Sequence, residues 1–440
     1  MTAERLSEIT DYIIRFLLGS DSNETFSRLI GYTSDKEQFS KYKIVIIPSG
    51  FFNPEFYNTE KSLPQLPLTV WEGIPLLFGE PVTEKSDETV IIHADIIASS
   101  FFLMSRYEEI INRNIRDSHG RFPGTKSLPF RAGFLQQPVV DEYGRLLRKL
   151  LRETGLDISE PEEKFSKIYL THDVDQLAHY RNIRGIGGAV LRFFKNPAES
   201  LKAVESFAGG IINDPWFTFP WLFDLADKLK NKKPEEKIEN IVFIKTGGGE
   251  LMTDKPRHDV RDRDFNTLFK LCEQHNVKIG LHPSYLAGMK PEYIKNEKKV
   301  LDETISQNTI YTRNHFLMSR EPEDMQTLIE AGLTDDFTMA YADITGFRLG
   351  TCRAVKWIDP VKLQLTSLTL HPLTIMDNTL SDERYMNLKT DEAFLFTKTM
   401  IDLVSKHNGE LVLLWHNTSV EKNNGQYHRD LYRWLINYLK

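Results

Sequence analysis

The chain has 440 residues, of which 40% are hydrophobic and 27% are charged, and its formal net charge is −7. This composition is that of a globular protein and excludes a disordered or fibrous chain, while the length exceeds one ordinary hydrophobic core. An acidic balance without a basic stripe excludes nucleic acid as the partner.

The first 162 residues predict a smaller α/β domain of unassigned role. Acidic residues stand where a signal peptide has basic ones, and no run approaches the roughly 20 apolar residues of a membrane-spanning helix. We therefore expect a cytoplasmic protein without a membrane span. Periodicity predicts helices over 3–18 and 139–152, and apolar runs predict strands over 43–48 and 89–95. The loop 113–124 is typical of a solvated surface loop more than of an anion site.

A polar linker over 159–167 predicts the domain boundary, so that a second domain spans 163–440. There, strand and helix patterns alternate, which implies α/β architecture with a mostly parallel sheet and suits closure into a barrel. The long connection 180–220 is expected to form a lid or a substrate wall. The expected strands are 167–171, 241–245, 277–281, 309–312, 366–370 and 411–415, and the expected helices are 220–231, 262–275, 291–305, 323–331, 391–407 and 428–439.

Ionisable side chains follow four of these expected strands. On a barrel all four strand ends lie on one face, where such folds place their chemistry. One aspartate and two histidines suit a catalytic divalent metal, and a second aspartate could act as a general base on water. The residues concerned are Asp173 and Asp175, His282, Arg313 with His315, and His416.

Each of these residues alone also has a structural interpretation. A strand-end histidine is more often structural than a ligand, Asp173 could cap a helix, and Trp415 suits core packing. The coincidence of four strand ends favours a site. His371 and Asp377 could line the same pocket, although core or loop roles are favoured. The other histidines are expected to be structural or solvated: His93, His119, His179, His258, His275, His407 and His428.

Four motifs in this order resemble the polysaccharide deacetylase family (NodB homology, carbohydrate esterase family 4), in particular a bacterial subgroup with an extra N-terminal domain. The motifs are Thr171–Asp175, Gly280–Ser284, Arg313–Phe316 and Leu414–His416. The resemblance covers about 165 to 440. It implies a distorted (β/α) barrel of about seven strands that removes N- or O-acetyl groups from sugars. It also implies a divalent metal, commonly Zn²⁺ with Ni²⁺ or Co²⁺ as alternatives, held by one aspartate and two histidines.

The resemblance assigns roles residue by residue. It implies that Asp173 is the catalytic base, that His416 is the proton donor and that Arg313 supports the base. A weaker match around 335–350 offers Arg348 or an acid there as a further group that orients the base. Contacts to substrate are expected from His172, Ser284, Asp343, Trp415 and Asn417.

The metal ligands implied by the resemblance are Asp175 and His282. The family's two aspartates are adjacent, whereas Val174 separates them here, so His172 stays open as an alternative ligand. The family's second histidine falls on Leu286, and His315 is the candidate replacement.

These assignments predict a metal-dependent hydrolase that acts on an acetylated carbohydrate, in surface polysaccharide or capsule metabolism. Two alternatives stay open. One is an amidohydrolase that acts on a small non-sugar amide. The other is a metal-free pseudoenzyme that binds carbohydrate or a partner protein, because Leu286 occupies a ligand position.

Overall fold

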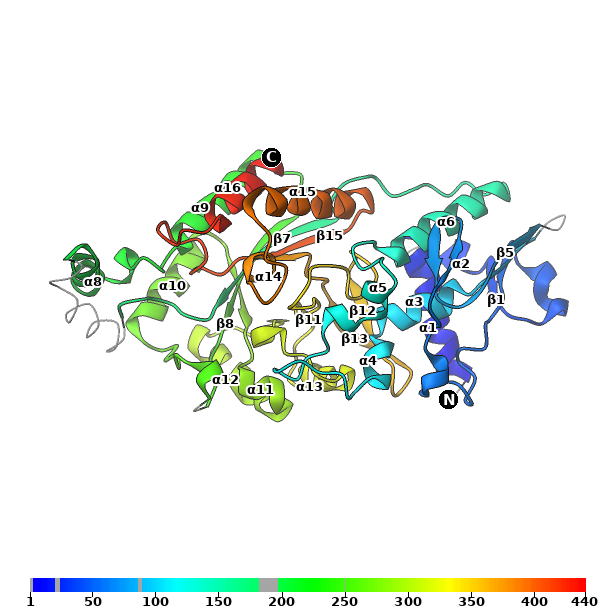
Figure 1. Cartoon of the computed structure of the whole chain (residues 1–440), viewed down its shortest axis with the longest axis horizontal. Helices are drawn as coiled ribbons and strands as arrows, with labels where there is room; N and C mark the ends of the chain where they lie inside the picture. The colour runs from blue at the N-terminus through cyan, green and yellow to red at the C-terminus, as the bar shows by residue number, and fades with distance from the viewer. Residues whose placement is uncertain (1–2, 20–23, 86–88, 182–196, 250) are drawn as a thin grey trace.

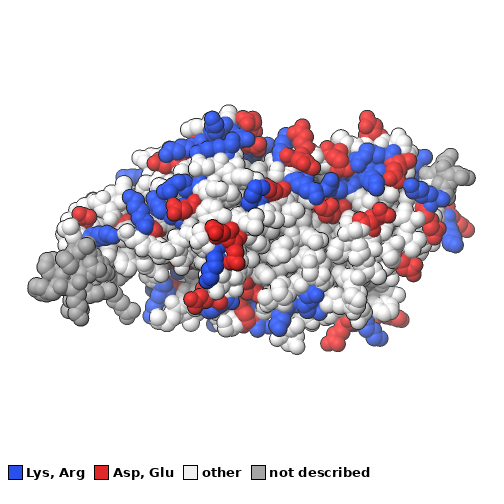
Figure 2. Space-filling model, turned by 45° about the horizontal axis from the view of Figure 1, so that its top comes forward, with Lys and Arg blue, Asp and Glu red and all other residues white. Residues whose placement is uncertain are grey.

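The computed structural model describes residues 3–19, 24–85, 89–181, 197–249 and 251–440. The molecule is elongated, with the N-terminal region at one end and a large sheet toward the other (Figure 1). Acidic and basic side chains are interspersed over the face drawn in Figure 2. Within the described part of the chain, no helix is both long and apolar enough to cross a membrane.

The N-terminal region contains a four-stranded sheet in the order β1-β2-β6-β5, of which only the β5–β6 pair is antiparallel. A separate hairpin joins β3 and β4. The strands are β1 (Ile30–Tyr32), β2 (Ile44–Ile46), β3 (Thr69–Trp71), β4 (Ile74–Leu76), β5 (Gly79–Lys85) and β6 (Val90–Ala94). The helices are α1 (Ala3–Leu17), α2 (Glu24–Ser27), α3 (Ile96–Met104), α4 (Tyr107–Ile111), α5 (Leu128–Arg131) and α6 (Val139–Glu153).

The rest of the chain forms a nine-stranded sheet in the order β12-β13-β11-β10-β9-β8-β7-β15-β14, parallel except for the β12–β13 pair. Its strands are β7 (Lys167–Val174), β8 (Ile238–Ile244), β9 (Lys278–Leu281), β10 (Tyr311–Thr312), β11 (Asp335–Asp336), β12 (Val355–Asp359), β13 (Gln364–Leu370), β14 (Ile375–Met376) and β15 (Glu410–Leu414). The helices are α8 (Pro197–Gly209), α9 (Phe219–Lys232), α10 (Arg263–Gln274), α11 (Tyr285–Met289), α12 (Ile294–Ile305), α13 (Gln326–Glu330), α14 (Asp377–Ser381), α15 (Thr390–Lys406) and α16 (His428–Tyr438).

The expected α/β class and the mostly parallel sheet are confirmed, and the six expected strands and six expected helices of this region are present. The sheet has nine strands, not about seven. Among the described residues no ladder joins β12 to β14, so a closed barrel is not confirmed. The lid expected over 180–220 includes residues 182–196, which lie outside the described residues.

The large sheet is strongly curled around an interior cluster of side chains. Tyr169 of β7 contacts Phe337, which follows β11, with ring centroids 4.9 Å apart although several strands separate them in the sheet. Val412 and Leu414 of β15 belong to the same buried cluster. Alternate residues of the central strands therefore point into the curl, and the others point toward the surrounding helices.

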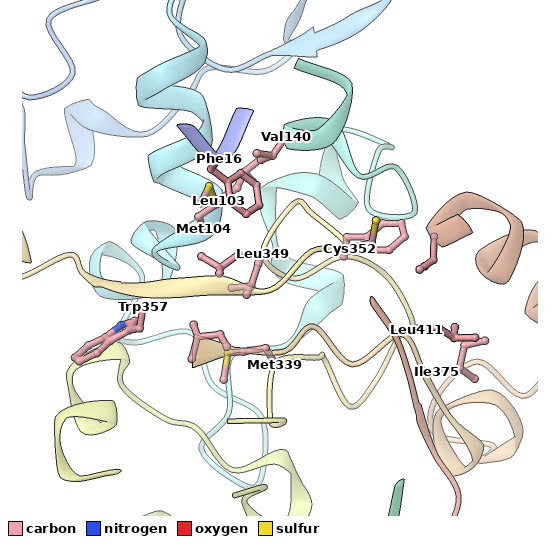
Figure 3. Packing of buried hydrophobic residues seen from close by; sticks show 14 of the residues in the cluster. Phe16, Leu103, Met104, Val140, Met339, Leu349, Cys352, Trp357, Ile375 and Leu411 are labelled. Atoms are coloured by element: carbon pink, nitrogen blue, oxygen red, sulfur yellow. The ribbon is translucent and has the colours of Figure 1, made fainter. Parts of the chain in front are cut away.

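The N-terminal region and the large sheet share one continuous hydrophobic core. Figure 3 shows Phe16, Leu103 and Val140 of the N-terminal region on one side of this core, with Leu349 of the sheet region next to them. The two cysteines, Cys272 and Cys352, are free and buried, as expected of small apolar side chains.

Candidate metal centre

The alternation of side chains along β7 decides which residues of its motif reach the interior. Thr171 and Asp173 point inward, where both accept hydrogen bonds from the Arg313 guanidinium. His172 points to the outer face, where its ring packs near the rings of Phe223 and Tyr432. The expected substrate contact by His172 and its alternative role as a ligand are therefore wrong.

Three possible metal ligands converge just beyond the carboxyl ends of β7, β9 and β10. Asp175 Oδ1 lies 3.2 Å from His282 Nε2 and 3.1 Å from His315 Nδ1, and the two nitrogens are 3.1 Å apart. Both imidazoles are buried, and a third of the Asp175 side chain is exposed. The structure thus brings His315 to the aspartate that the sequence offered as a ligand, while Leu286 lies in the first turn of α11.

The protons on both imidazoles are fixed by backbone carbonyls. His282 Nδ1 lies 2.6 Å from the carbonyl oxygen of Arg313, and His315 Nε2 lies 3.0 Å from that of Thr253. Because a carbonyl only accepts, these nitrogens carry the protons in the neutral rings. The opposite nitrogens therefore direct lone pairs at each other and at a carboxylate oxygen, an arrangement that requires a cation or an added proton.

The spacing of the three donors fits a divalent metal. Zinc–nitrogen and zinc–oxygen bonds of about 2.0–2.1 Å in a tetrahedron place neighbouring donors roughly 3.3 Å apart. The observed separations of 3.1, 3.1 and 3.2 Å are close to that value. Burial acts to raise the pKa of Asp175, but protonation of the neighbouring imidazoles, His315 above all, holds that pKa well below its usual range, so the carboxylate is ionised.

A second carboxylate, Asp173, lies beside the trio of candidate ligands Asp175, His282 and His315. Its Oδ1 accepts a hydrogen bond of 3.0 Å from Arg313 Nη1, and its Oδ2 lies 3.8 Å from His282 Nε2. The Arg313 guanidinium is fully buried over the Phe243 ring and also donates to the carbonyl of Phe337. Arg313 therefore fixes the orientation of Asp173 and leaves one of its oxygens toward the pocket.

His416 approaches the trio from the opposite side, after β15. Its Nε2 lies 3.6 Å from Asp175 Oδ2, and its Nδ1 lies 2.8 Å from Oδ1 of the buried Asp377. Burial alone would lower the pKa of His416, but the Asp377 carboxylate, with the charges of Asp175 and Asp173, raises it to about 10. A divalent cation beside Asp175 would oppose this rise.

These groups line one cavity of about 150 Å³. Its lining also includes Arg384 and Tyr385, which follow α14, and Arg121 from the N-terminal region. The cavity therefore has a charged lining that includes both the buried imidazoles of the candidate ligands and the exposed Arg384.

Several residues expected at the site do not contact it. Arg348 donates to the buried Glu109 carboxylate, so the expected role beside Asp173 is filled by Arg313. Asp343 accepts hydrogen bonds from the backbone of Gly124 and Thr125 and serves the junction with the N-terminal region.

Three further expected substrate contacts are buried structural residues. Ser284 caps α11 and donates to Glu297, and it is fully buried. Trp415 and Asn417 flank the inward-pointing His416 and therefore face outward. Trp415 is fully buried in the core, and the Asn417 amide donates to the carbonyls of Gln176 and Trp216.

Sequence reasoning missed or underrated three supporting residues. Asp377 holds His416 and is not a mere core or loop residue. His258 lies with Nε2 2.8 Å from the carbonyl oxygen of Asp175, and Arg121 is buried at the pocket, contrary to the surface-loop interpretation. Asp377 follows β14, a strand of only two residues that leaves no pattern in the sequence, and nothing in the sequence indicated His258.

Two of three comparisons with known proteins found a similarity to this chain. A family described as a family of unknown function (DUF7033) matches residues 2–156. The search of curated proteins found no match. Among solved structures, the chain is similar to the crystal structure of a "putative polysaccharide deacetylase from Mycobacterium smegmatis", with 13% identity and a TM-score of 0.40 over 64% of this chain and 86% of that one.

Proposed function

We propose that this protein is a divalent-metal-dependent hydrolase that removes an N- or O-linked acetyl group from a carbohydrate. One observation carries the proposal: two imidazole lone pairs and a carboxylate oxygen converge within 3.1–3.2 Å of one another, beside an oriented carboxylate and an oriented imidazole. The choice of a carbohydrate, of surface polysaccharide or capsule metabolism, and of a barrel form for the curled sheet rests on the motif resemblance.

Asp175, His282 and His315 would hold the metal. A divalent metal bound there would polarise the acetyl carbonyl and make water more acidic. Two nitrogen donors and one oxygen donor suit Zn²⁺ and also Ni²⁺ or Co²⁺, which take the same ligand types.

Asp173 would act as the general base. Its free oxygen faces the cavity and accepts the proton of the attacking water, while the Arg313 hydrogen bond keeps the carboxylate from turning away. Because Arg313 is buried and fixed by three acceptors, this orientation needs no rearrangement during the reaction.

His416 would donate the proton to the departing amine or alcohol. Its Nε2 faces the cavity, and Asp377 accepts the hydrogen bond from Nδ1 and stabilises the imidazolium before transfer. The water proton taken by Asp173 and the proton given by His416 balance, and exchange with solvent restores both groups after acetate leaves.

The small cavity favours a second candidate, hydrolysis of a small non-sugar amide. A volume of about 150 Å³ is below the range of about 300–1,000 Å³ usual for ligand pockets and matches a site that holds a benzene-sized group. It admits an acetyl group with its nearest neighbours, or one entire small amide.

Elemental analysis of the purified, zinc-reconstituted protein tests the proposal. We expect about one metal ion per chain in the wild type and clearly less in His315→Ala, because removal of one of three ligands weakens the site. His275→Ala is the matched control, since His275 pairs with Asp227 away from the cavity, and it should retain the metal.

Acetate release from acetylated sugars and from small amides then separates the two candidates. We expect Asp173→Asn to lower kcat by about 10²–10⁴, the usual contribution of a general base. Full activity in Asp173→Asn would remove that residue from the mechanism. A wild type that binds no zinc after reconstitution would favour the metal-free binding protein.

A further inference from the structure

The candidate ligand His315 begins a turn of unusual backbone conformation. The two residues that follow it, Phe316 and Leu317, have φ angles of 59° and 51°. L-residues avoid this left-handed region, and the conformation persists only where the surroundings fix it. The position of the His315 imidazole therefore depends on whatever holds this turn.

A loop of the N-terminal region holds it. Arg121 Nη1 donates a hydrogen bond of 2.7 Å to the carbonyl oxygen of Phe316. The same guanidinium donates to Asp117 through Nε and approaches the hydroxyl of Tyr385. Only 6% of Arg121 is exposed, so this contact is shielded from water.

The Phe316 ring is fixed by the same loop. His119 lies with its ring centroid 5.0 Å from that of Phe316, and its Nδ1 is 3.2 Å from the hydroxyl of Tyr285 in α11. Tyr285 and His315 flank the ring at 5.4 and 4.6 Å. The ring is thus held by one residue of the N-terminal region and two of the sheet region.

Hydrogen bonds within the loop fix the positions of His119 and Arg121. Asp117 Oδ1 accepts hydrogen bonds from the backbone nitrogens of His119 and Arg121, and Gly120 takes a φ of 79° between them. In Figure 1 this cyan segment follows α4 and reaches toward α11. The loop 117–121 therefore has a defined shape at the edge of the cavity.

We propose that the loop 117–121 is a positioning element of the metal centre, so that the N-terminal region completes a site whose ligands all come from the sheet region. Arg121 keeps the turn 315–317 left-handed, which sets His315 Nδ1 within 3.1 Å of Asp175 and of His282. Without the Arg121 hydrogen bond the turn relaxes, and the His315 imidazole moves away from Asp175 and His282. The inference rests on the proposed function, because it presupposes that the trio binds a metal.

Zinc affinity of the full chain tests this role, measured by competition with a chromophoric chelator. We expect Arg121→Met, which keeps the apolar stem and removes the donors, to bind zinc at least tenfold more weakly than the wild type. Arg121→Lys, which retains one donor for the Phe316 carbonyl, should recover part of the loss. The visible absorption of the Co²⁺-substituted protein should change in Arg121→Met, since the geometry of the ligands changes.

Arg113→Met is the matched control. Arg113 belongs to the same segment and pairs with Glu321 and Glu323 of the sheet region, but its side chain is 41% exposed and lines no part of the cavity. It should bind zinc as the wild type does, and a cooperative thermal transition of metal-free Arg121→Met should show that this variant is folded. If Arg121→Met does not fold, Asp117→Asn, which loosens the same guanidinium, takes its place.

The outcomes separate the two hypotheses. Zinc affinity in Arg121→Met within twofold of the wild type, with an unchanged Co²⁺ spectrum, would overturn the positioning role and leave the metal centre intact. A wild type without zinc affinity would overturn the proposed function and this inference together.

Discussion

At the scale of single residues, His371 is a buried imidazole that pairs with two carboxylates away from the metal centre. Its Nδ1 lies 2.6 Å from Glu410 Oε2 and its Nε2 lies 3.0 Å from Asp335 Oδ1, while its ring stacks on Phe337. Burial acts to lower the pKa of His371, but the hydrogen bonds and charges of the two carboxylates raise it to about 9. His371 is therefore an imidazolium that joins β11, β13 and β15.

This coupling predicts a pH-dependent stability. The pKa is raised on folding, so the stabilisation is complete below about pH 6.5, the unfolded value, and is lost as the pH rises through 9. Its upper limit is on the order of 3 kcal/mol. We expect the melting temperatures of the wild type and of His371→Asn to differ most below pH 6.5 and to converge toward pH 9.5. A constant difference across that range would contradict the assignment.

The side chains that converge at the metal centre could be predicted from the sequence because each follows an apolar strand. The errors follow from the period of two along a strand, which the motif alone did not take into account. His172 precedes the inward Asp173, and Trp415 and Asn417 flank the inward His416, so all three point away from the cavity. Because side chains along a strand point inward and outward in turn, counting from the inward Asp173 and His416 would have excluded these three residues from the site.

At the scale of elements, β9 depends on the absence of a side chain at Gly280. A Cβ there would lie 2.6 Å from the Phe243 ring and 3.2 Å from Tyr311. The Phe243 ring carries the Arg313 guanidinium at 4.6 Å, and Arg313 orients Asp173. A change in β9 is therefore transmitted to the candidate base through two packed side chains.

We expect Gly280→Ala to destabilise the protein by about 1–3 kcal/mol, the usual effect of overpacking a core. Its kcat should fall more than its KM rises, because the displaced ring moves the base and not the substrate-binding wall. Gly249→Ala is the control, since its Cβ would meet only Leu286 at an ordinary 3.4 Å. Equal melting temperatures for the two variants would contradict the tight contact at Gly280.

Among the strands of the large sheet, the sequence did not predict β11, β12 and β14. β11 is the polar pair Asp335–Asp336, and β14 has only two residues, so neither has a periodic signal. Both form because longer neighbours, β13 and β15, offer them parallel partners. Such strands are determined by tertiary contacts and not by local propensity.

At the scale of the whole molecule, the N-terminal region and the sheet region are joined by polar contacts as well as by core packing. Glu109 of α4 accepts hydrogen bonds from Arg348, and Asp141 of α6 accepts them from Thr351 and Cys352. All of these residues are buried. The division near residue 162 stays a prediction, and the contacts across it are those of one folded unit.

A fragment that spans 163–440 tests this view. It would expose Leu349, which is fully buried beside Leu103 in the intact chain, and would leave the Arg348 guanidinium without its carboxylate. We expect the fragment to aggregate or to lose its cooperative thermal transition, whereas coexpression with residues 1–162 should restore both. A soluble, monomeric fragment with a sharp transition would show that the sheet region folds independently.

The shared core also sets the order in which the chain acquires structure during its synthesis. α1 leaves the ribosome about 350 residues before β13, the strand it packs against, and α3 leaves it about 250 residues before its partner β12. At about 5–20 residues per second, those two helices spend roughly 12–70 seconds with an uncovered apolar face. The nascent N-terminal region is therefore a natural client for a chaperone, and slowed translation before residue 355 should lower the yield of native protein.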